Sequence, residues 1–113
     1  MTECIFCKIV AGELPTTCLH DDEYIYAFRD INPQAPIHFL VIPKVHIDSA
    51  AAITSDNSVL AAKCFEVIAE LARTEGLDDG FRVITNIGED GGMTVKHLHF
   101  HVLGGQSLGE KLI

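Results

Sequence analysis

Hydrophobic and polar residues alternate near the end of the chain, in the segment His97-Leu98-His99-Phe100-His101-Val102-Leu103. A period of two is typical of a β-strand, and we predict a strand over about residues 96–104. Successive side chains of a strand point to opposite faces of the sheet, so the three histidines would share one face. Leu98, Phe100 and Val102 would share the other. The apolar face is a candidate core surface, and the histidine face is a candidate functional site.

Three other segments have the pattern of strands. Residues 18–28 predict a hairpin that turns at Asp21-Asp22. Residues 37–42 form a dense apolar run that Pro43 ends, which is typical of a central strand covered on both faces. Residues 81–86 alternate again and predict a further strand.

Two segments predict helices. A short helix over residues 2–11 would be capped by Thr2, and Gly12 stands where a helix commonly ends. A long helix over about residues 57–75 would have Asp56 as its N-cap and would end before Gly76.

The apolar stripe of this long helix is broader than one core contact requires. It comprises Val59, Leu60, Ala62, Cys64, Phe65, Val67, Ile68, Ala69, Leu71 and Ala72. We expect the helix to pack against the sheet and also against another subunit. The alternative is a helix buried more deeply within its own domain.

Composition narrows the class of protein. The chain has 113 residues, enough for a single domain over residues 1–113. No apolar run approaches the ~18–20 residues that span a bilayer, and the N-terminus lacks the layout of a signal peptide, so we expect a cytoplasmic protein without a membrane partner. The net charge of -8 argues against a nucleic-acid binder. The four cysteines are expected to be reduced thiols or metal ligands.

A glycine-rich stretch, residues 88–94, directly precedes the histidines. Backbone N–H groups of such loops can hold a phosphate. His99, flanked by two further imidazoles, could then attack phosphorus as a nucleophile while His101 donates a hydrogen bond to the phosphate. The rival interpretation is a zinc site, made by three histidines or by two histidines and the Cys4-x-x-Cys7 pair. The residues alone leave both interpretations open.

The histidine segment is similar to the signature of the histidine triad (HIT) family. Residues 33–44 and 102–105 resemble the branch of histidine triad nucleotide-binding proteins, the purine nucleoside phosphoramidases. The resemblance extends from Ile5 to about Gly105. It implies an α+β fold with a five-stranded antiparallel sheet, one long helix and one short helix. It also implies a homodimer joined through the long helix and a strand.

The resemblance further implies a reaction. Members of this branch bind purine mononucleotides and cleave nucleoside 5′-phosphoramidates at the P–N bond, through a nucleotidyl-histidine intermediate. The implied catalytic residues are His99 as nucleophile, His101 and Thr94 as contacts to the phosphate, and His38 and His97 as supporting histidines. The implied nucleotide-binding residues are Phe6, Asp30, Ile31, Asn86, Gly92, Thr94, Val95, His99 and His101.

Some members of the family also carry zinc. The resemblance implies that Cys4, Cys7, His46 and His97 hold this ion in a closed structural site. It therefore gives His97 to the metal and leaves His99 and His101 for the chemistry.

Three features depart from the branch. Thr94 stands where a serine is more usual, Lys96 lies just before the triad, and residues 106–113 lack the tryptophan-containing ending. Two alternative functions therefore stay open. One is hydrolysis of dinucleoside polyphosphates, and the other is a non-catalytic, zinc-stabilised nucleotide-binding adaptor.

Overall fold

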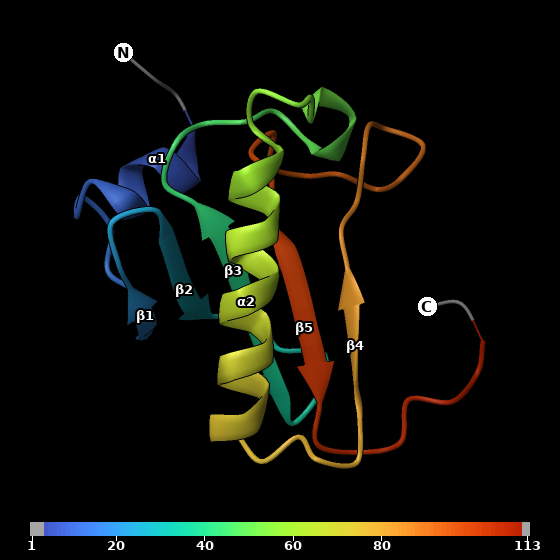
Figure 1. Cartoon of the computed structure of the whole chain (residues 1–113). Coiled ribbons are helices and arrows are strands. Elements are labelled where there is room, and N and C mark those ends of the chain that lie inside the picture. Colours follow the sequence, from blue (N-terminus) through green and yellow to red (C-terminus); the bar gives the residue numbers. More distant parts are fainter. Residues whose placement is uncertain (1–3, 112–113) are drawn as a thin grey trace.

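A five-stranded antiparallel sheet forms the centre of the computed structural model, which describes residues 4–111. Along the sheet the strands follow the order β1-β2-β3-β5-β4. In sequence order the elements are α1 (Ile5–Val10), β1 (Cys18–Asp21), β2 (Ile25–Arg29), β3 (Ile37–Pro43), η1 (Ala50–Ala52), α2 (Ser58–Thr74), β4 (Phe81–Ile84) and β5 (Phe100–Gly104) (Figure 1). The predicted α+β fold with a five-stranded antiparallel sheet is therefore confirmed.

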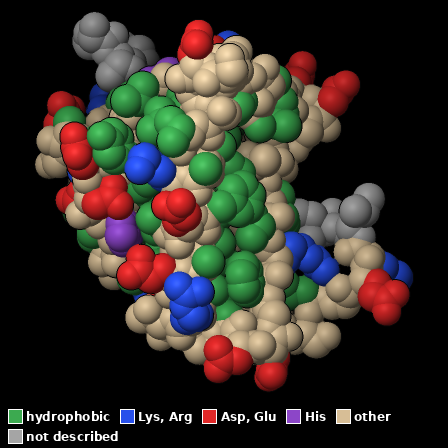
Figure 2. Space-filling view, in the orientation of Figure 1, with side chains coloured by type: hydrophobic (Ala, Val, Ile, Leu, Met, Phe, Trp, Pro, Cys, Tyr) green, Lys and Arg blue, Asp and Glu red, His purple; other side chains and the backbone are tan. Residues whose placement is uncertain are grey.

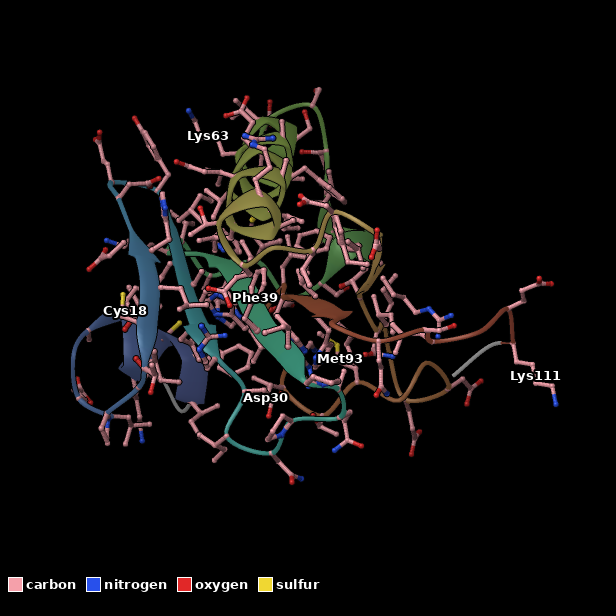
Figure 3. The ribbon with its side chains drawn as sticks, turned by 90° about the horizontal axis from the view of Figure 1, so that it is seen from below. Cys18, Asp30, Phe39, Lys63, Met93 and Lys111 are labelled. Atoms are coloured by element: carbon pink, nitrogen blue, oxygen red, sulfur yellow. The ribbon has the colours of Figure 1, made fainter. Side chains whose placement is uncertain are left out.

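The two helices cover opposite faces of this sheet. Phe39 and Val41 of β3 belong to the larger core cluster, to which α2 contributes, whereas Leu40 and Ile42 belong to a smaller cluster with α1. All four side chains are at most 5% exposed, so β3 is covered on both sides, as its dense apolar sequence predicts. Figure 3 shows α2 on one side of the sheet and Asp30 on the other. The face that bears Asp30 also carries the site described below.

Both helices begin later than the sequence predicts. Helix α1 has Cys4 as its N-cap, whose Sγ accepts a hydrogen bond from the Cys7 N–H, so the helix starts at Ile5. Thr2, the predicted cap, lies outside the described residues. The N-cap of α2 is Asn57 and not Asp56. The side chain of Asn57 bonds backward to the backbone of the preceding turn, at Thr54 N and Ala52 O, and thereby fixes the entry to the helix.

The strand predicted over residues 96–104 is shorter than expected, because β5 begins only at Phe100. Val41 pairs with Phe100, so continuing this register would set Pro43 opposite Leu98. Proline has no N–H to donate and cannot extend the ladder. The carbonyl of Pro43 instead accepts a hydrogen bond from His97 Nε2 at 2.9 Å, and Leu98 N donates to Ile47 O at 2.6 Å. Residues 96–99 therefore leave the sheet, and the prediction of a regular strand is wrong for them.

Hydrophobic side chains remain exposed beside α2. Figure 2 shows them as a strip alongside the helix, on the side towards β4. Val59 and Phe65 of α2 are 57% and 50% exposed, and Phe81 at the start of β4 is 41% exposed. Strand β4 is also an edge strand of the sheet (Figure 1). Within residues 4–111 no helix is both long and apolar enough to cross a membrane.

Candidate functional site

The three histidines of the triad lie in a row although only His101 belongs to a strand. The rings of His99 and His101 are 5.1 Å apart between centroids. Phe6 of α1 packs edge-on against both His97 and His99, with centroid separations of 5.9 and 5.1 Å. His97 and His99 are buried, and His101 is partly buried. Helix α1 therefore forms one wall of the histidine row.

Hydrogen bonding fixes the proton of His99. Its Nδ1 lies 2.6 Å from the carbonyl oxygen of His97, and a carbonyl can only accept, so Nδ1 carries the hydrogen. Burial lowers the pKa of His99 below its ordinary value, while the hydrogen bond to His97 O opposes this shift. The ring is then neutral near pH 7, and its Nε2 retains a lone pair. A lone pair on a buried imidazole is what a nucleophile at this position requires.

A second chain of hydrogen bonds fixes His101. The backbone N–H of Gln34 donates to His38 Nδ1 at 3.0 Å, so the proton of a neutral His38 sits on Nε2. This Nε2–H donates to His101 Nδ1, also at 3.0 Å, which leaves the proton of His101 on its own Nε2. Burial lowers the pKa of His38, and burial together with the neighbouring His99 and His38 lowers that of His101 to about 4. His101 is thus a neutral Nε2–H donor next to the lone pair of His99.

Asp30 stands beside this chain. It follows β2 directly, and its Oδ2 lies 3.4 Å from His38 Nε2. Its other oxygen, Oδ1, accepts a hydrogen bond from Asn32 N at 2.7 Å. The next residue, Ile31, is 95% exposed, so its side chain makes little contact with the rest of the chain.

The glycine-rich loop is closed onto itself. Asn86 Nδ2 donates to Gly91 O at 2.8 Å, which holds the loop next to the end of β4. A Cβ at Gly91 would collide with the carbonyl oxygen of Ile87, so only glycine fits there without a shift of the loop. Gly92 has a φ of 79°, in the left-handed region that glycine favours. Thr94 is exposed and Val95 is partly buried, both between this loop and the histidines.

A cavity of about 450 Å³ brings several of these residues together. Its lining includes Gln34, His38, Arg82, Asn86, His101 and Lys111. It therefore joins β3, β4, β5 and the C-terminal tail. Arg82 and Lys111 give it positive charge in a protein whose net charge is -8. A larger hollow of about 730 Å³, beneath the C-terminal tail, contains none of the predicted site residues.

Four predicted metal ligands also come together. One ligand atom from each of Cys4, Cys7, His46 and His97 lies within 4.8 Å of the other three. Cys4 Sγ is 3.4 Å from His97 Nδ1, and Cys7 Sγ is 3.3 Å from His46 Nδ1 and 3.6 Å from His97 Nδ1. Zinc bonds of ~2.3 Å to sulfur and ~2.05 Å to nitrogen give a tetrahedron whose S···N edges are about 3.5 Å. The donor set and its spacing therefore fit zinc.

The imidazoles of this group are oriented by their other nitrogens. His97 Nε2 donates to Pro43 O, and His46 Nε2 lies 2.9 Å from Asp48 Oδ1. Both rings therefore turn an unprotonated Nδ1 towards the two sulfurs, the arrangement that metal-binding histidines usually have. In this arrangement the Nδ1 of His97 is available to a metal, as the resemblance implies, and the carbonyl of His97 orients His99.

A second trio of possible metal ligands has a different explanation. Atoms of Asp30, His38 and His101 also lie within 4.8 Å of one another. However, His38 Nδ1 accepts from Gln34 N, so a neutral His38 must carry its proton on the nitrogen that faces the other two groups. A protonated nitrogen cannot bind a metal. This trio is therefore a hydrogen-bonded chain.

The sequence patterns missed three residues that orient the histidines: Gln34, Pro43 and Asp48. Gln34 and Pro43 act through backbone groups, which side-chain patterns do not reveal. Asp48 follows His46 by two residues, and this His-x-Asp spacing is a signal that could have identified it.

Comparisons with known proteins agree with this geometry. The HIT domain model matches residues 11–108. Protein HitA of Neisseria gonorrhoeae is 45% identical over 104 residues, which cover 92% of this chain and 97% of HitA. The purine nucleoside phosphoramidase of Escherichia coli K12 is 40% identical over 111 residues, which cover 97% and 93% of the two chains. A solved HIT family hydrolase from Clostridium thermocellum superimposes with a TM-score of 0.97 at 41% identity, covering 100% of this chain and 99% of its own. The row of histidines, the fold around it and these matches together establish that the chain belongs to the HIT domain family.

Proposed function

We propose that this protein is a hydrolase that cleaves purine nucleoside 5′-phosphoramidates at the P–N bond, through a nucleotidyl-histidine intermediate on His99. The observation that carries the proposal is that the neighbouring rings of His99 and His101 are held in opposite tautomers. His99 has its lone pair on Nε2, and His101 has its hydrogen on Nε2. The first is suited to attack phosphorus, and the second to donate to a phosphoryl oxygen.

The relatives support a hydrolase as the general class. A solved structure with 41% identity is a HIT family hydrolase, and a relative with 40% identity is a purine nucleoside phosphoramidase. Both align over nearly their whole length with this chain. They support the substrate class, a purine nucleotide whose α-phosphorus bears an amine.

The proposed reaction has two steps. In the first, His99 Nε2 forms a bond to the α-phosphorus while the P–N bond breaks, and the departing amine takes up a proton from solvent. In the second, water attacks the phosphorus and loses a proton to solvent, the bond to His99 breaks, and a nucleoside monophosphate leaves. His101 donates its Nε2–H to a phosphoryl oxygen throughout, and stabilises the charge that develops there.

The nucleotide would occupy the face of the sheet that carries α1. Phe6 and Ile31 would contact the base, and Asp30 would bind the ribose hydroxyls. Asn86, Gly92, Thr94 and the backbone of Val95 would surround the phosphate, and the nearly complete exposure of Ile31 leaves its side chain available to a ligand. His38 supports His101 in this arrangement through the 3.0 Å hydrogen bond between them.

We also propose that zinc binds Cys4, Cys7, His46 and His97 and serves a structural role. With four protein ligands the ion would have no open coordination position, and it would tie α1 to the segment that precedes His99. Phe6 lies between Cys4 and Cys7 and packs against the ring of His99. The metal would therefore support the nucleophile without taking part in the reaction.

The exposed strip along α2 supports the proposal of a homodimer. Val59, Phe65 and Phe81 expose large apolar side chains next to the unpaired edge of β4. An edge strand beside an apolar surface is normally covered in a stable protein. A second copy of this chain would cover both.

The proposed reaction is tested by steady-state hydrolysis of a fluorogenic adenosine 5′-phosphoramidate. We expect turnover by the wild type and its complete loss in His99→Ala, because the unprotonated nitrogens of His97 and His101 face the two cysteine sulfurs and His38. A matched control is His20→Ala, which removes a histidine that pairs with Asp22 outside the site. Circular dichroism would show that both variants are folded.

Three results would contradict the proposal. Turnover by folded His99→Ala would exclude His99 as nucleophile. Faster hydrolysis of a dinucleoside polyphosphate than of the phosphoramidate would change the substrate class. Tight binding of AMP or GMP by a wild type that hydrolyses neither substrate would indicate a binding protein.

A further inference from the structure

The carboxylate of Asp30 has a neighbour that ribose binding does not explain. Its Oδ2 lies 3.4 Å from His38 Nε2, the nitrogen that also donates to His101 Nδ1 at 3.0 Å. The Asp30 backbone N–H donates to the carbonyl of the same His38, at 3.1 Å. Asp30 is therefore attached to His38 through both its backbone and its side chain.

Burial strengthens the interaction between Asp30 and His38. The side chains of His38 and Asp30 are only 4% and 18% exposed. A charge interacts more strongly with a neighbouring N–H where water is largely excluded. The carboxylate also cannot swing away easily, because Asn32 N holds its other oxygen at 2.7 Å. The negative charge is thus fixed next to the Nε2–H of His38.

The two acceptors of this N–H belong to different parts of the site. His101 would contact the phosphate, whereas Asp30 would contact the ribose. His38 lies between them and has one proton to direct, since Gln34 N–H occupies its other nitrogen. A change at Asp30 therefore affects His101 through one hydrogen atom, the one on His38 Nε2.

We propose that Asp30 is a positioning residue for the phosphate donor: its Oδ2 holds the Nε2–H of His38, and His38 in turn holds His101 with its hydrogen directed to the substrate. This inference rests on the proposed function and adds to it. The negative charge of Asp30 favours a hydrogen on the His38 nitrogen that faces it, and this is the hydrogen that His101 Nδ1 accepts. Because the same carboxylate would bind the ribose, ribose binding and the orientation of the phosphate donor depend on one side chain.

The test uses a substrate from which the ribose contact is already missing. On the 5′-phosphoramidate of 2′,3′-dideoxyadenosine, Asp30 has no hydroxyl to bind. If Asp30 only binds ribose, Asp30→Asn leaves kcat on this substrate unchanged. The coupling predicts that kcat falls about tenfold or more, as expected when a charge-assisted hydrogen bond that supports a catalytic group is lost.

A double-mutant cycle identifies His38 as the intermediary. In a His38→Gln background, Asp30→Asn should change kcat on the dideoxy substrate less than twofold. Asp22→Asn is the matched control, because it makes the same substitution in the His20–Asp22 pair. Asp22 precedes β2 and Asp30 follows it, so the control lies at the other end of that strand and should leave kcat unchanged. An unchanged kcat in Asp30→Asn, or an equal loss in both backgrounds, would overturn the inference.

Ring-nitrogen NMR of the ligand-free protein provides a readout that does not depend on turnover. In the wild type, His101 should give the signals of a single Nε2–H tautomer. In Asp30→Asn these signals should move towards the average of two tautomers, while those of His20 stay in place. Unchanged His101 signals in Asp30→Asn would overturn the inference. A wild type without any turnover would overturn the proposed function, and the NMR result would then decide the inference alone.

Discussion

Replacing Cys4 with alanine removes one corner of the group formed by Cys4, Cys7, His46 and His97. Three S···N distances of 3.3–3.6 Å within the group match the edges of a zinc tetrahedron, about 3.5 Å. We therefore expect wild-type protein to contain one zinc ion per chain and Cys4→Ala to contain almost none. The loss should lower the thermal stability, because the metal binds the folded chain and has no preformed site in the unfolded chain.

The size of this effect follows from mass action. At a free zinc concentration 100 times the Kd, binding stabilises the folded state by about 2.7 kcal/mol. The entropy of unfolding for 113 residues is about 0.24 kcal/mol/K, from ~2.1 cal/mol/K per residue. The ratio predicts that Tm falls by about 11 °C in Cys4→Ala at that concentration. Tighter binding would enlarge the difference.

The assay combines metal analysis with differential scanning calorimetry, with and without a chelator. The chelator should lower Tm of the wild type and should have no effect on Cys4→Ala. Cys18→Ala is the matched control, because Cys18 is an exposed cysteine on β1, outside the metal group. This variant should have the zinc content and the Tm of the wild type. The reasoning is refuted if wild type expressed with zinc contains no metal and if added zinc does not raise its Tm.

Two further predictions concern pH and assembly. Burial lowers the pKa of His101 in the folded chain to about 4, from an ordinary value of 6.5. Between these pH values the unfolded chain binds more protons than the folded chain. The contribution of His101 to the free energy of unfolding is therefore full above about pH 6.5 and is lost as the pH falls towards 4. The urea midpoint should accordingly be lower at pH 5 than at pH 7.5, with a smaller difference in His101→Gln; an equal or higher midpoint at pH 5 would contradict this. Ala62→Arg, within the apolar strip between Val59 and Phe65, should convert a dimer into a 12.3 kDa monomer in analytical ultracentrifugation, whereas Glu70→Arg on the polar side of α2 should not. A monomeric wild type, or a dimeric Ala62→Arg, would exclude α2 as the interface.

The elements that the sequence predicts well are those with a strong pattern of their own. The dense apolar run of β3 and the long apolar stripe of α2 each need only neighbouring residues to be recognised. The start of β5 could not be predicted in this way, because it depends on Pro43, more than fifty residues away in the chain, which ends the ladder. The cap of α2 was predicted one residue too early, because Asp56 and Asn57 are both good capping residues and only the turn at Thr54 selects between them.

The candidate site was likewise predicted only in part from the sequence. Spacing alone identified the histidine row, but it left a nucleophile and a metal site as alternatives. The family resemblance assigned His97 to the metal, and the distances from His97 to Cys4 and Cys7, which come from the other end of the chain, agree with that assignment. The contact between Asp30 and His38 joins two residues across the loop between β2 and β3, and no periodicity predicts it.

Helix α1 is only six residues long, yet it contributes to both the candidate metal site and the candidate active site. Cys7 belongs to the metal group, and the adjacent Phe6 packs against the ring of His99. Substitutions in this helix cannot alter one site without disturbing the other, so during divergence the cysteines and the aromatic wall are constrained to evolve together. Ile31, in the loop after β2, is 95% exposed and packs against neither site. Changes of nucleoside preference, natural or engineered, are therefore expected to accumulate at Ile31 and to spare α1.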